Sequence, residues 1–270
     1  DILEHRSSMA KVIIKELTAF KKAYGKERKT VIDNLKEAVV AAKKIEEQDV
    51  VFLMDRFGYA KIVDTSVYER NKEAADTENR YILTCKNTDK ICIFTNKGQM
   101  HLLKVLDLPY GKFRDKGIPI DNLSNYDSSE ENFIYIINLG AIIHSRLLFG
   151  TKTAMLKMVD GSEFDVAKRT TAATKLNEDD ELLIVHAMTG EETVVMQSEK
   201  EMFLRIEAST IPEKKKGAVG VRGMKLNAGD ALSNIYVLDG ESEQTVEVKG
   251  KEVVLNRLRV GNRDTKGTKR

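Results

Sequence analysis

The stretch Ile91–Leu123, ICIFTNKGQMHLLKVLDLPYGKFRDKGIPIDNL, contains the clearest copy of a unit that most of the chain repeats. Its first apolar run, Ile91–Thr95, is predicted to be a strand buried on both faces. The tripeptide Asn96-Lys97-Gly98 then provides a tight hairpin turn, in which glycine accepts a positive φ angle. A second strand is expected over Gln99–Val105, followed by a loop rich in cations and glycine and then a further apolar run. The predicted order is strand, turn, strand, basic loop, strand.

Four weaker copies of this unit occur along the chain, at residues 50–83, 147–176, 193–226 and, in truncated form, 245–270. Self-similarity with a period of tens of residues is typical of stacked or radially arranged supersecondary units. Acidic segments between copies, such as Glu178–Glu181 and Gly229-Asp230, lead into one more apolar run each. With that run every copy has about four strands, which is the content of a propeller blade. The sequence therefore predicts an all-β, propeller-like disc of about five blades of four strands.

The composition fits a folded body without a membrane span. The 270 residues include 41% hydrophobic and 32% charged residues, and no apolar run approaches the roughly 20 residues of a transmembrane helix. The net charge of +2 indicates little by itself, so the positions of the cations matter. Cys85 and Cys92 are too few for a zinc cluster or a disulfide framework, and we expect two reduced strand residues in a cytosolic protein. Because the sequence starts at Asp1 with neither Met nor a signal peptide, we expect a piece of a longer polypeptide.

Residues 1–48 are predicted to be a helical segment and residues 49–270 the β-rich domain. Ser7 and Ser8 offer N-caps to a helix that Gly25 ends. Its apolar residues recur every three or four positions and predict a stripe that packs on a partner helix; they are Met9, Val12, Ile13, Leu17, Phe20 and Tyr24. The segment Val31–Gln48 fits a helix and, in part, a strand, and we favour the helix.

Several ordered motifs carry a family resemblance. Ile14–Leu17 and Lys21–Thr30 resemble the helix that leaves the dimerising coiled coil in the A subunits of bacterial type IIA topoisomerases. Asp49-Val50-Val51 with Arg56–Lys61 is similar to the opening of their C-terminal DNA-wrapping domain. Ile93–Gly98, followed by Lys116–Ile120, is similar to the second blade of that domain. The resemblance covers nearly the whole chain and includes the A subunits of DNA gyrase and of topoisomerase IV.

The resemblance implies a β-pinwheel, a disc of propeller-like blades that exchange strands, with double-stranded DNA bent around its basic rim. It also implies a bacterial, cytoplasmic, nucleoid-associated isomerase as the parent protein, in which an ATP-hydrolysing B subunit and one further copy of the A subunit would be the partners. In the resembled enzymes the DNA-cleaving tyrosine and the sites for Mg²⁺ and ATP lie in other domains or in the other subunit. We therefore expect no catalytic residue, metal site or cofactor in this chain.

A surface that wraps DNA must neutralise phosphates repeatedly without reading bases, so Lys and Arg should recur once per structural unit on one edge. Glycines beside these cations, among them Gly117, Gly220 and Gly267, are interpreted as letting the backbone approach a phosphate. The candidate DNA-binding residues come from the second to the fifth copy; they are Lys112, Arg114, Lys116, Lys168, Arg169, Lys175, Lys214, Lys215, Lys216, Arg222, Arg257, Arg259, Arg263 and Lys266.

The first copy departs from the resembled family. In gyrase its loop carries a box of the pattern Gln-Arg-Arg-Gly-Gly-Lys-Gly, whereas this chain has Tyr68–Asp76, without glycine and with three carboxylates. The hypothesis is a topoisomerase IV-like or divergent gyrase-like domain that bends DNA but wraps it less completely. The alternative is a propeller-like protein-interaction scaffold, because fold alone does not decide function.

Other polar residues are interpreted as structural. The pairs Glu130-Glu131 and Asp179-Asp180 flank strands and are expected to be solvated turn residues. The histidines are isolated in sequence and are expected to be surface or packed residues, not ligands; they are His5, His101, His144 and His186.

Overall fold

The computed structural model describes residues 5–27, 29–30 and 45–270, and its contacts divide the chain into a unit of residues 1–44 and a unit of residues 45–270. The first unit contains helix α1 (Arg6–Tyr24), and the second contains all the strands. The predicted helix over Val31–Gln48 lies largely outside the described residues, and its described part, residues 45–48, is not helical. No helix in the described ranges is long and apolar enough to span a membrane.

Helix α1 confirms the predicted N-terminal helix but not its cap. The helix begins at least two residues earlier than expected, with His5 at the N-cap and no side-chain capping bond, so the prediction of Ser7 or Ser8 as the cap is wrong. Gly25 follows its last turn as expected, and its amide donates to the carbonyl of Lys21. No residue of α1 is buried, and its apolar stripe is exposed, up to 75% at Tyr24.

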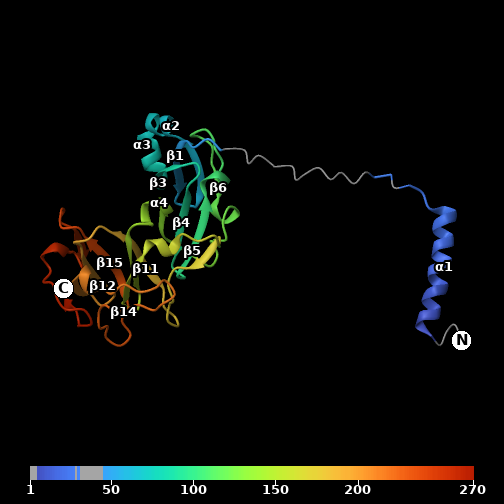
Figure 1. The fold of residues 1–270 in the computed structure, drawn as a ribbon. Helices are drawn as coiled ribbons and strands as arrows, with labels where there is room; N and C mark the ends of the chain where they lie inside the picture. Colours follow the sequence, from blue (N-terminus) through green and yellow to red (C-terminus); the bar gives the residue numbers. More distant parts are fainter. Residues whose placement is uncertain (1–4, 28, 31–44) are drawn as a thin grey trace. The chain divides into compact units, whose positions relative to one another are not determined.

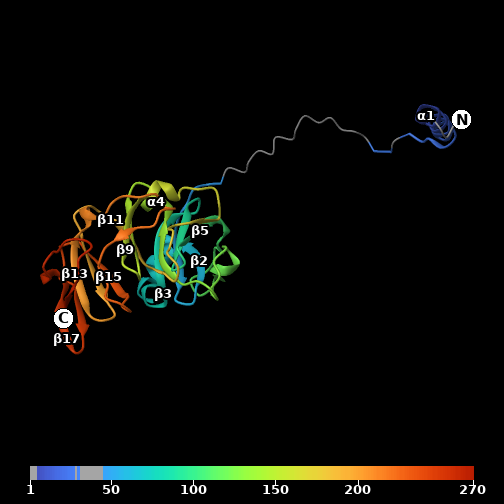
Figure 2. The ribbon, with the colours of Figure 1, turned by 90° about the horizontal axis from the view of Figure 1, so that it is seen from below.

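The second unit is built from antiparallel sheets that follow one another in chain order (Figures 1 and 2). The first sheet has the order β3-β1-β2-β6, the second β10-β5-β4-β7, the third β11-β8-β9-β14 and the fourth β15-β12-β13-β18. The strands are β1 (Asp49–Asp55), β2 (Tyr59–Asp64), β3 (Asn79–Lys86), β4 (Lys90–Thr95), β5 (Gln99–Lys104), β6 (Ile118–Pro119), β7 (Phe133–Asn138), β8 (Arg146–Thr151), β9 (Met155–Asp160), β10 (Thr170–Ala172), β11 (Leu182–Met188), β12 (Thr193–Ser198), β13 (Met202–Glu207), β14 (Val221–Arg222), β15 (Leu232–Leu238), β16 (Thr245–Val248), β17 (Lys251–Val254) and β18 (Thr268–Lys269).

Each four-stranded sheet takes its fourth strand from the following copy. Strand β6 of the second copy pairs with β2 of the first, and β10, β14 and β18 pair in the same way with β5, β9 and β13. This exchange stitches neighbouring sheets together through the backbone. The fifth copy contributes β18 to the fourth sheet and keeps a two-stranded sheet of β16 and β17, so the described chain has four complete blades and one partial blade.

The core lies between successive sheets, because the central strands are buried on both faces. In β4, Ile91 and Ile93 belong to the cluster shared with the first sheet, whereas Cys92 and Phe94 belong to the cluster shared with the third. The two-sided burial expected for this strand is confirmed. The turn after it is also as predicted, with Gly98 at φ +70°.

The first copy differs from the others between its second and third strands. Residues 68–76, expected to be a loop, lie within helices α2 (Thr65–Arg70) and α3 (Lys72–Glu78) and the residue between them. The segment lacks glycine and proline and contains good helix formers such as Ala74 and Ala75. Val67, Tyr68 and Ala75 pack on Val51, Leu53 and Val63, and so the helices cover the face of the first sheet that is turned away from the second. The helices thus supply the apolar cover that a neighbouring sheet supplies elsewhere.

Short helical segments also occur in the other copies. Helix α4 (Leu139–Ile142) precedes the third sheet, and single 3₁₀ turns follow the second strand of each later copy or close its loop. They are η1 (Val105–Asp107), η2 (Ile120–Asn122), η3 (Gly161–Phe164), η4 (Ala208–Thr210) and η5 (Leu255–Arg257).

Cys85 and Cys92 lie in β3 and β4, and both are free and buried, as the sequence predicts. Burial raises the pKa of the Cys85 thiol to about 11 and that of Cys92 to about 12. Since the thiolate is the reactive form, neither cysteine is set up for nucleophilic chemistry.

Candidate nucleic-acid interface

The exchanged strands place one connection of each later copy on the outer edge of the preceding sheet. We call residues 108–117, 165–169, 211–220 and 258–267 the crossing connections. Three of them run parallel to the strand that they cross, through the bridges Ile62 to Tyr110, Met158 to Glu213 and Arg205 to Val260. The remaining connection is held by the amide of Leu102, which donates to the carbonyl of Arg169 at 2.7 Å.

Most of the candidate cations lie on these four connections. The sequence alone does not show that these cations occupy equivalent places in the fold. The structure distributes them over four successive sheet edges: Lys112, Arg114 and Lys116 on the first, Lys168 and Arg169 on the second, Lys214, Lys215 and Lys216 on the third, and Arg259, Arg263 and Lys266 on the fourth. Lys175 and Arg222 lie after or within donated strands instead, and Arg257 ends η5.

Some of these cations already have partners within the protein. Lys215 approaches Glu163 at 3.5 Å, Arg222 approaches Asp264 at 3.4 Å and Arg257 approaches Glu243 at 3.2 Å. The ammonium of Lys216 donates to the carbonyl of Glu163 at 2.6 Å. Others have no side-chain hydrogen bond or ion pair to any described residue and are free to meet an anion; they are Lys112, Arg114, Lys168, Arg169, Lys175, Lys214, Arg259 and Lys266.

Neighbouring connections contact each other on the third and fourth sheets. Arg263 donates to the carbonyl of Arg222 at 2.9 Å, and the amide of Asp264 donates to the carbonyl of Gly223 at 2.7 Å. The fourth connection therefore lies against the strand that ends the third connection. Two cations from consecutive copies, Arg222 and Arg263, are therefore in contact there.

The glycines at the ends of three connections have a role that differs from the expected one. A Cβ atom at Gly117 would lie 2.5 Å from the carbonyl oxygen of Ala60, and φ at Gly117 is +82°. A Cβ at Gly220 would lie 2.6 Å from the carbonyl oxygen of Leu156, and one at Gly267 2.8 Å from that of Phe203. These glycines let the donated strand approach the sheet, so their close approach is to protein backbone.

A buried lysine, which the sequence analysis did not select, lies beneath the third connection. Lys157 in β9 is 1% exposed, and its ammonium donates to the carbonyls of Lys216 at 2.7 Å, Ala218 at 2.8 Å and Lys215 at 3.2 Å. Burial lowers its pKa to about 8, while the charge of Glu163 acts in the opposite direction. Its signal in the sequence is a single cation within the apolar run Met155–Val159.

Lys61 makes the same kind of contact on the first sheet. Its ammonium donates to the carbonyls of Phe113 and, at 2.7 Å, Asp115, both on the first connection. Burial lowers the pKa of Lys61. On the fourth sheet Arg205 donates to the carbonyls of Asn256 and, at 3.3 Å, Leu258 at the start of the connection. A side chain of the crossed strand thus holds the backbone of three connections.

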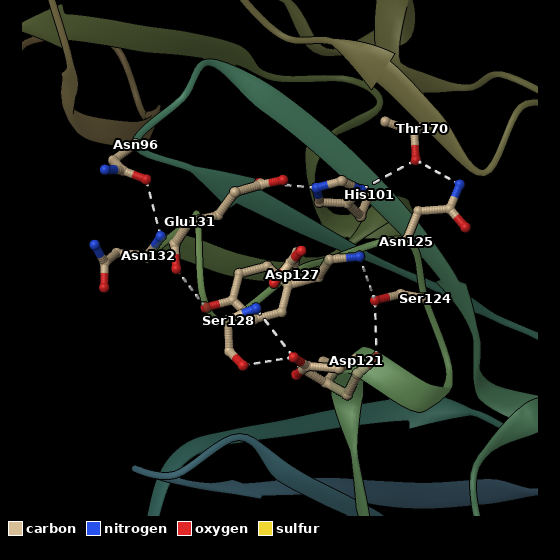
Figure 3. A network of polar contacts seen from close by, with 12 residues as sticks. Asn96, His101, Asp121, Ser124, Asn125, Asp127, Ser128, Glu131, Asn132 and Thr170 are labelled. Carbon is tan, nitrogen blue, oxygen red and sulfur yellow. Dashed lines mark hydrogen bonds and ion pairs between the residues drawn. The ribbon is translucent and has the colours of Figure 1, made fainter.

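On the second sheet a network of polar side chains lies where the other sheets have a single cation that holds the connection (Figure 3). His101 in β5 is 2% exposed, with Nδ1 3.0 Å from the hydroxyl of Thr170 in β10 and Nε2 2.9 Å from the carboxylate of Glu131. Asn125 donates to the same hydroxyl at 2.9 Å, and Tyr126 donates to the carbonyl of Glu131 at 2.8 Å. His101 is packed inside the protein, which is one of the two environments expected for the histidines. Glu131 is a hydrogen-bonding partner of His101, so the expectation that Glu131 is a solvated turn residue is wrong.

Asp180 is a second acidic residue that the sequence analysis misplaced. Its side chain is buried and accepts hydrogen bonds from the amide and the hydroxyl of Thr153, at 3.0 and 2.6 Å. It fixes the β8–β9 turn to the segment before β11. Next to it, Glu181 pairs with Lys152 at 2.7 Å and with Lys97 of the second sheet at 3.5 Å. These acids join turns and neighbouring sheets, because a buried carboxylate needs donors nearby.

Four sheets that exchange their outer strands, with a cationic connection at each exchange, define the chain as a β-pinwheel. A family model described as "DNA gyrase C-terminal domain, beta-propeller" matches residues 145–187 and 192–239, which contain most of the third and fourth sheets. Over its whole length the chain is 29% identical to the A subunit of DNA gyrase from Staphylococcus epidermidis and spans 32% of that protein. The chain thus covers about a third of the length of this curated relative.

Two solved structures share the fold. The C-terminal domain of DNA topoisomerase IV has a TM-score of 0.74 and 22% identity, with 83% of this chain and 73% of that chain covered. The E. coli ParC C-terminal domain has a TM-score of 0.67 and 14% identity, with 83% of this chain and 94% of that chain covered. The chain therefore has the β-pinwheel fold of these two domains, and its sequence is similar to that of a DNA gyrase A subunit.

Proposed function

We propose that this chain binds duplex DNA without sequence specificity and bends it along the four crossing connections. The observation that carries this proposal is the recurrence of unpaired Lys and Arg side chains at equivalent edges of four successive sheets. Phosphates recur along a duplex, so a repeating row of cations matches them without any contact to base edges. The contact between Arg222 and Arg263 places cations of two blades side by side, where the DNA would pass from one blade to the next.

We further propose that the chain acts as the C-terminal domain of a type IIA topoisomerase A subunit. In this role it would present a bent DNA segment to the cleavage core of the whole enzyme. The partners would be an ATP-hydrolysing B subunit, together with a second A subunit, and ATP and Mg²⁺ would be used outside this chain. The similarity to a gyrase A subunit over the full chain supports this assignment.

Binding is tested with a duplex of about 40 base pairs that carries a fluorophore at each end. We expect energy transfer to rise on binding as the ends approach, and affinity to fall by orders of magnitude between about 50 and 200 mM salt. The triple variant Lys168→Glu, Arg169→Glu, Lys214→Glu should lose affinity tenfold or more, because it reverses three cations that have no partner within the described protein. These side chains make no hydrogen bond or ion pair with the described residues, so we expect the fold to be unaffected.

A matched control reverses three exposed lysines of α1, with Lys11→Glu, Lys15→Glu and Lys22→Glu, and changes the total charge by the same amount. Affinity should then stay within about twofold of the unaltered chain. Equal losses in both triple variants would mean that only net charge matters. Absence of binding at low salt would refute the DNA proposal and favour a protein-interaction scaffold.

The first blade bears on the kind of topoisomerase. Where gyrase carries its glycine-rich basic box, this chain has α2 and α3, which are packed on the first sheet and contain Glu69, Glu73 and Asp76. We propose that DNA is not drawn over this blade and that the wrap is incomplete. The parent enzyme should accordingly relax or decatenate DNA but supercoil relaxed plasmid poorly. Gyrase-like supercoiling by the full-length enzyme, measured on agarose gels, would contradict this proposal.

A further inference from the structure

Lys157, in β9, is buried beneath the third crossing connection. Three backbone carbonyls, those of Lys215, Lys216 and Ala218, converge on its ammonium within 3.2 Å. An ammonium has three donors, and all three are used here. The backbone of residues 215–218 is thereby curled around a fixed point in β9.

The backbone conformation of residues 215–218 sets the directions in which the lysine side chains of the connection leave the backbone. With the carbonyls of residues 215 and 216 turned inward, the Lys215 side chain remains 87% exposed and that of Lys214 has no partner within the described chain. The ammonium of Lys216 is held back against Glu163. Lys215 is therefore exposed on a backbone that Lys157 holds, and Lys214, which has no partner among the described residues, precedes it directly.

The fourth sheet shows that packing does not require a lysine at the position of Lys157. By the pairing of the donated strands, Leu156 with Val221 and Phe203 with Thr268, Leu204 occupies in the fourth sheet the register position of Lys157. Leu204 is buried in the core there. Lys61 occupies the position in the first sheet, where Ala60 pairs with Ile118, and it also holds its connection by carbonyls.

A charge at this position is unfavourable for packing alone. The charged group that acts on Lys157 is Glu163, whose carboxylate makes no direct bond to it, and the ring of Phe149 lies 5.5 Å from the ammonium. A buried ammonium without a paired carboxylate costs stability compared with an apolar residue. The presence of a lysine beneath a cationic connection therefore points to a requirement other than stability.

We infer that Lys157 is a positioning residue of the DNA interface: it fixes the backbone of residues 215–218 so that Lys214 and Lys215 meet the phosphates together. This inference rests on the proposed function. Lys157 touches no DNA itself, and Lys61 performs the same task for the first connection.

The first test measures the free protein. Hydrogen–deuterium exchange of the full chain should show faster exchange in the peptide covering residues 213–220 when Lys157→Met is introduced. The peptide covering residues 165–172, on the second sheet, should be unchanged. Lys200→Met is the matched control, since it removes one exposed cation that donates to the carbonyl of Ala228, away from the connections.

The second test measures DNA binding as a function of salt. Each phosphate contact contributes about 0.9 to the slope of log affinity against log salt, so Lys157→Met should lower the slope by about 1 to 2 if Lys214 and Lys215 lose their places. A purely structural role would lower the melting temperature and leave the slope unchanged. In a chain that already carries Lys214→Gln and Lys215→Gln, Lys157→Met should have no further effect on the slope.

The outcomes separate this inference from the proposed function. A Lys157→Met variant that keeps the slope of the unaltered chain, or that shifts it equally in the Lys214→Gln, Lys215→Gln background, would overturn the positioning role and leave DNA binding intact. No DNA binding by the unaltered chain would overturn both. If Lys157→Met proves poorly folded, Lys61→Met tests the same relation on residues 111–117, with the slope as the readout.

Discussion

Replacing Phe94 by alanine is expected to lower the free energy of unfolding by about 4 kcal/mol, which is in the range for removing a fully buried aromatic side chain. Phe94 is 0% exposed in β4. Its ring centroid lies 5.2 Å from that of Phe164 and 5.9 Å from that of Phe149, both from the third copy. The substitution would leave a cavity between the second and third sheets and remove two edge-to-face contacts.

Chemical denaturation of the full chain, followed by circular dichroism, measures this effect. Phe57→Ala serves as the control, because Phe57 is 71% exposed at the β1–β2 turn and its loss should change stability by less than about 0.5 kcal/mol. A loss below about 1 kcal/mol for Phe94→Ala would show that the second and third sheets do not depend on this aromatic cluster. Since two sheets meet at Phe94, we also expect both to become less protected from hydrogen exchange.

The repeat and its turns were predictable because they depend on local signals. Alternating apolar residues around Asn96-Lys97-Gly98 specify a hairpin whose strands are buried on both sides, and the structure has that hairpin. The exchange of strands was not readable from the residues. Strand β6 consists of only Ile118–Pro119, and nothing in two residues says which sheet they join. The resemblance supplied the exchange, and the pairing of Tyr59 with Pro119 establishes it for this chain.

The candidate interface was predictable in composition but not in construction. Runs such as Lys214–Lys216 stand out in the sequence, whereas the residue that holds them, Lys157, is a single cation 57 or more positions earlier. Glu131 and Asp180 look like ordinary turn acids, and only the fold brings His101 and Thr153 to them. Contacts between segments far apart in sequence have no local pattern, so sequence reasoning assigned these residues to solvent.

The helices of the first blade illustrate a different limit. Residues 68–76 have helical propensity, but the expectation of a loop came from comparison with the other copies. The second to fourth copies have a sheet on each side, whereas the outer face of the first sheet is covered by α2 and α3 through Val67 and Ala75. A position at the end of a repeat array changes what its residues must cover.

The buried ammonium of Lys157 should make stability depend on pH in an unusual direction. Its pKa is lowered from 10.5 to about 8 by burial. Between these two values the unfolded chain binds the proton more often than the folded chain, so the free energy of unfolding rises with pH. The full shift corresponds to about 3 kcal/mol, which is missing below pH 8 and is gained as the pH approaches 10.5.

The measurement is the difference in unfolding free energy between the unaltered chain and Lys157→Met, taken from pH 7 to pH 10. Subtraction cancels the titration of other lysines and of tyrosines such as Tyr126, whose pKa burial raises to about 12. We expect the variant to be as stable as the unaltered chain, or more so, at pH 7, and to lose this advantage above pH 8. A difference that stays constant with pH would mean that the ammonium is well solvated in the folded state. A rising difference would establish that the chain tolerates a buried charge at neutral pH, and the carbonyls of residues 215, 216 and 218 are what that charge holds in place.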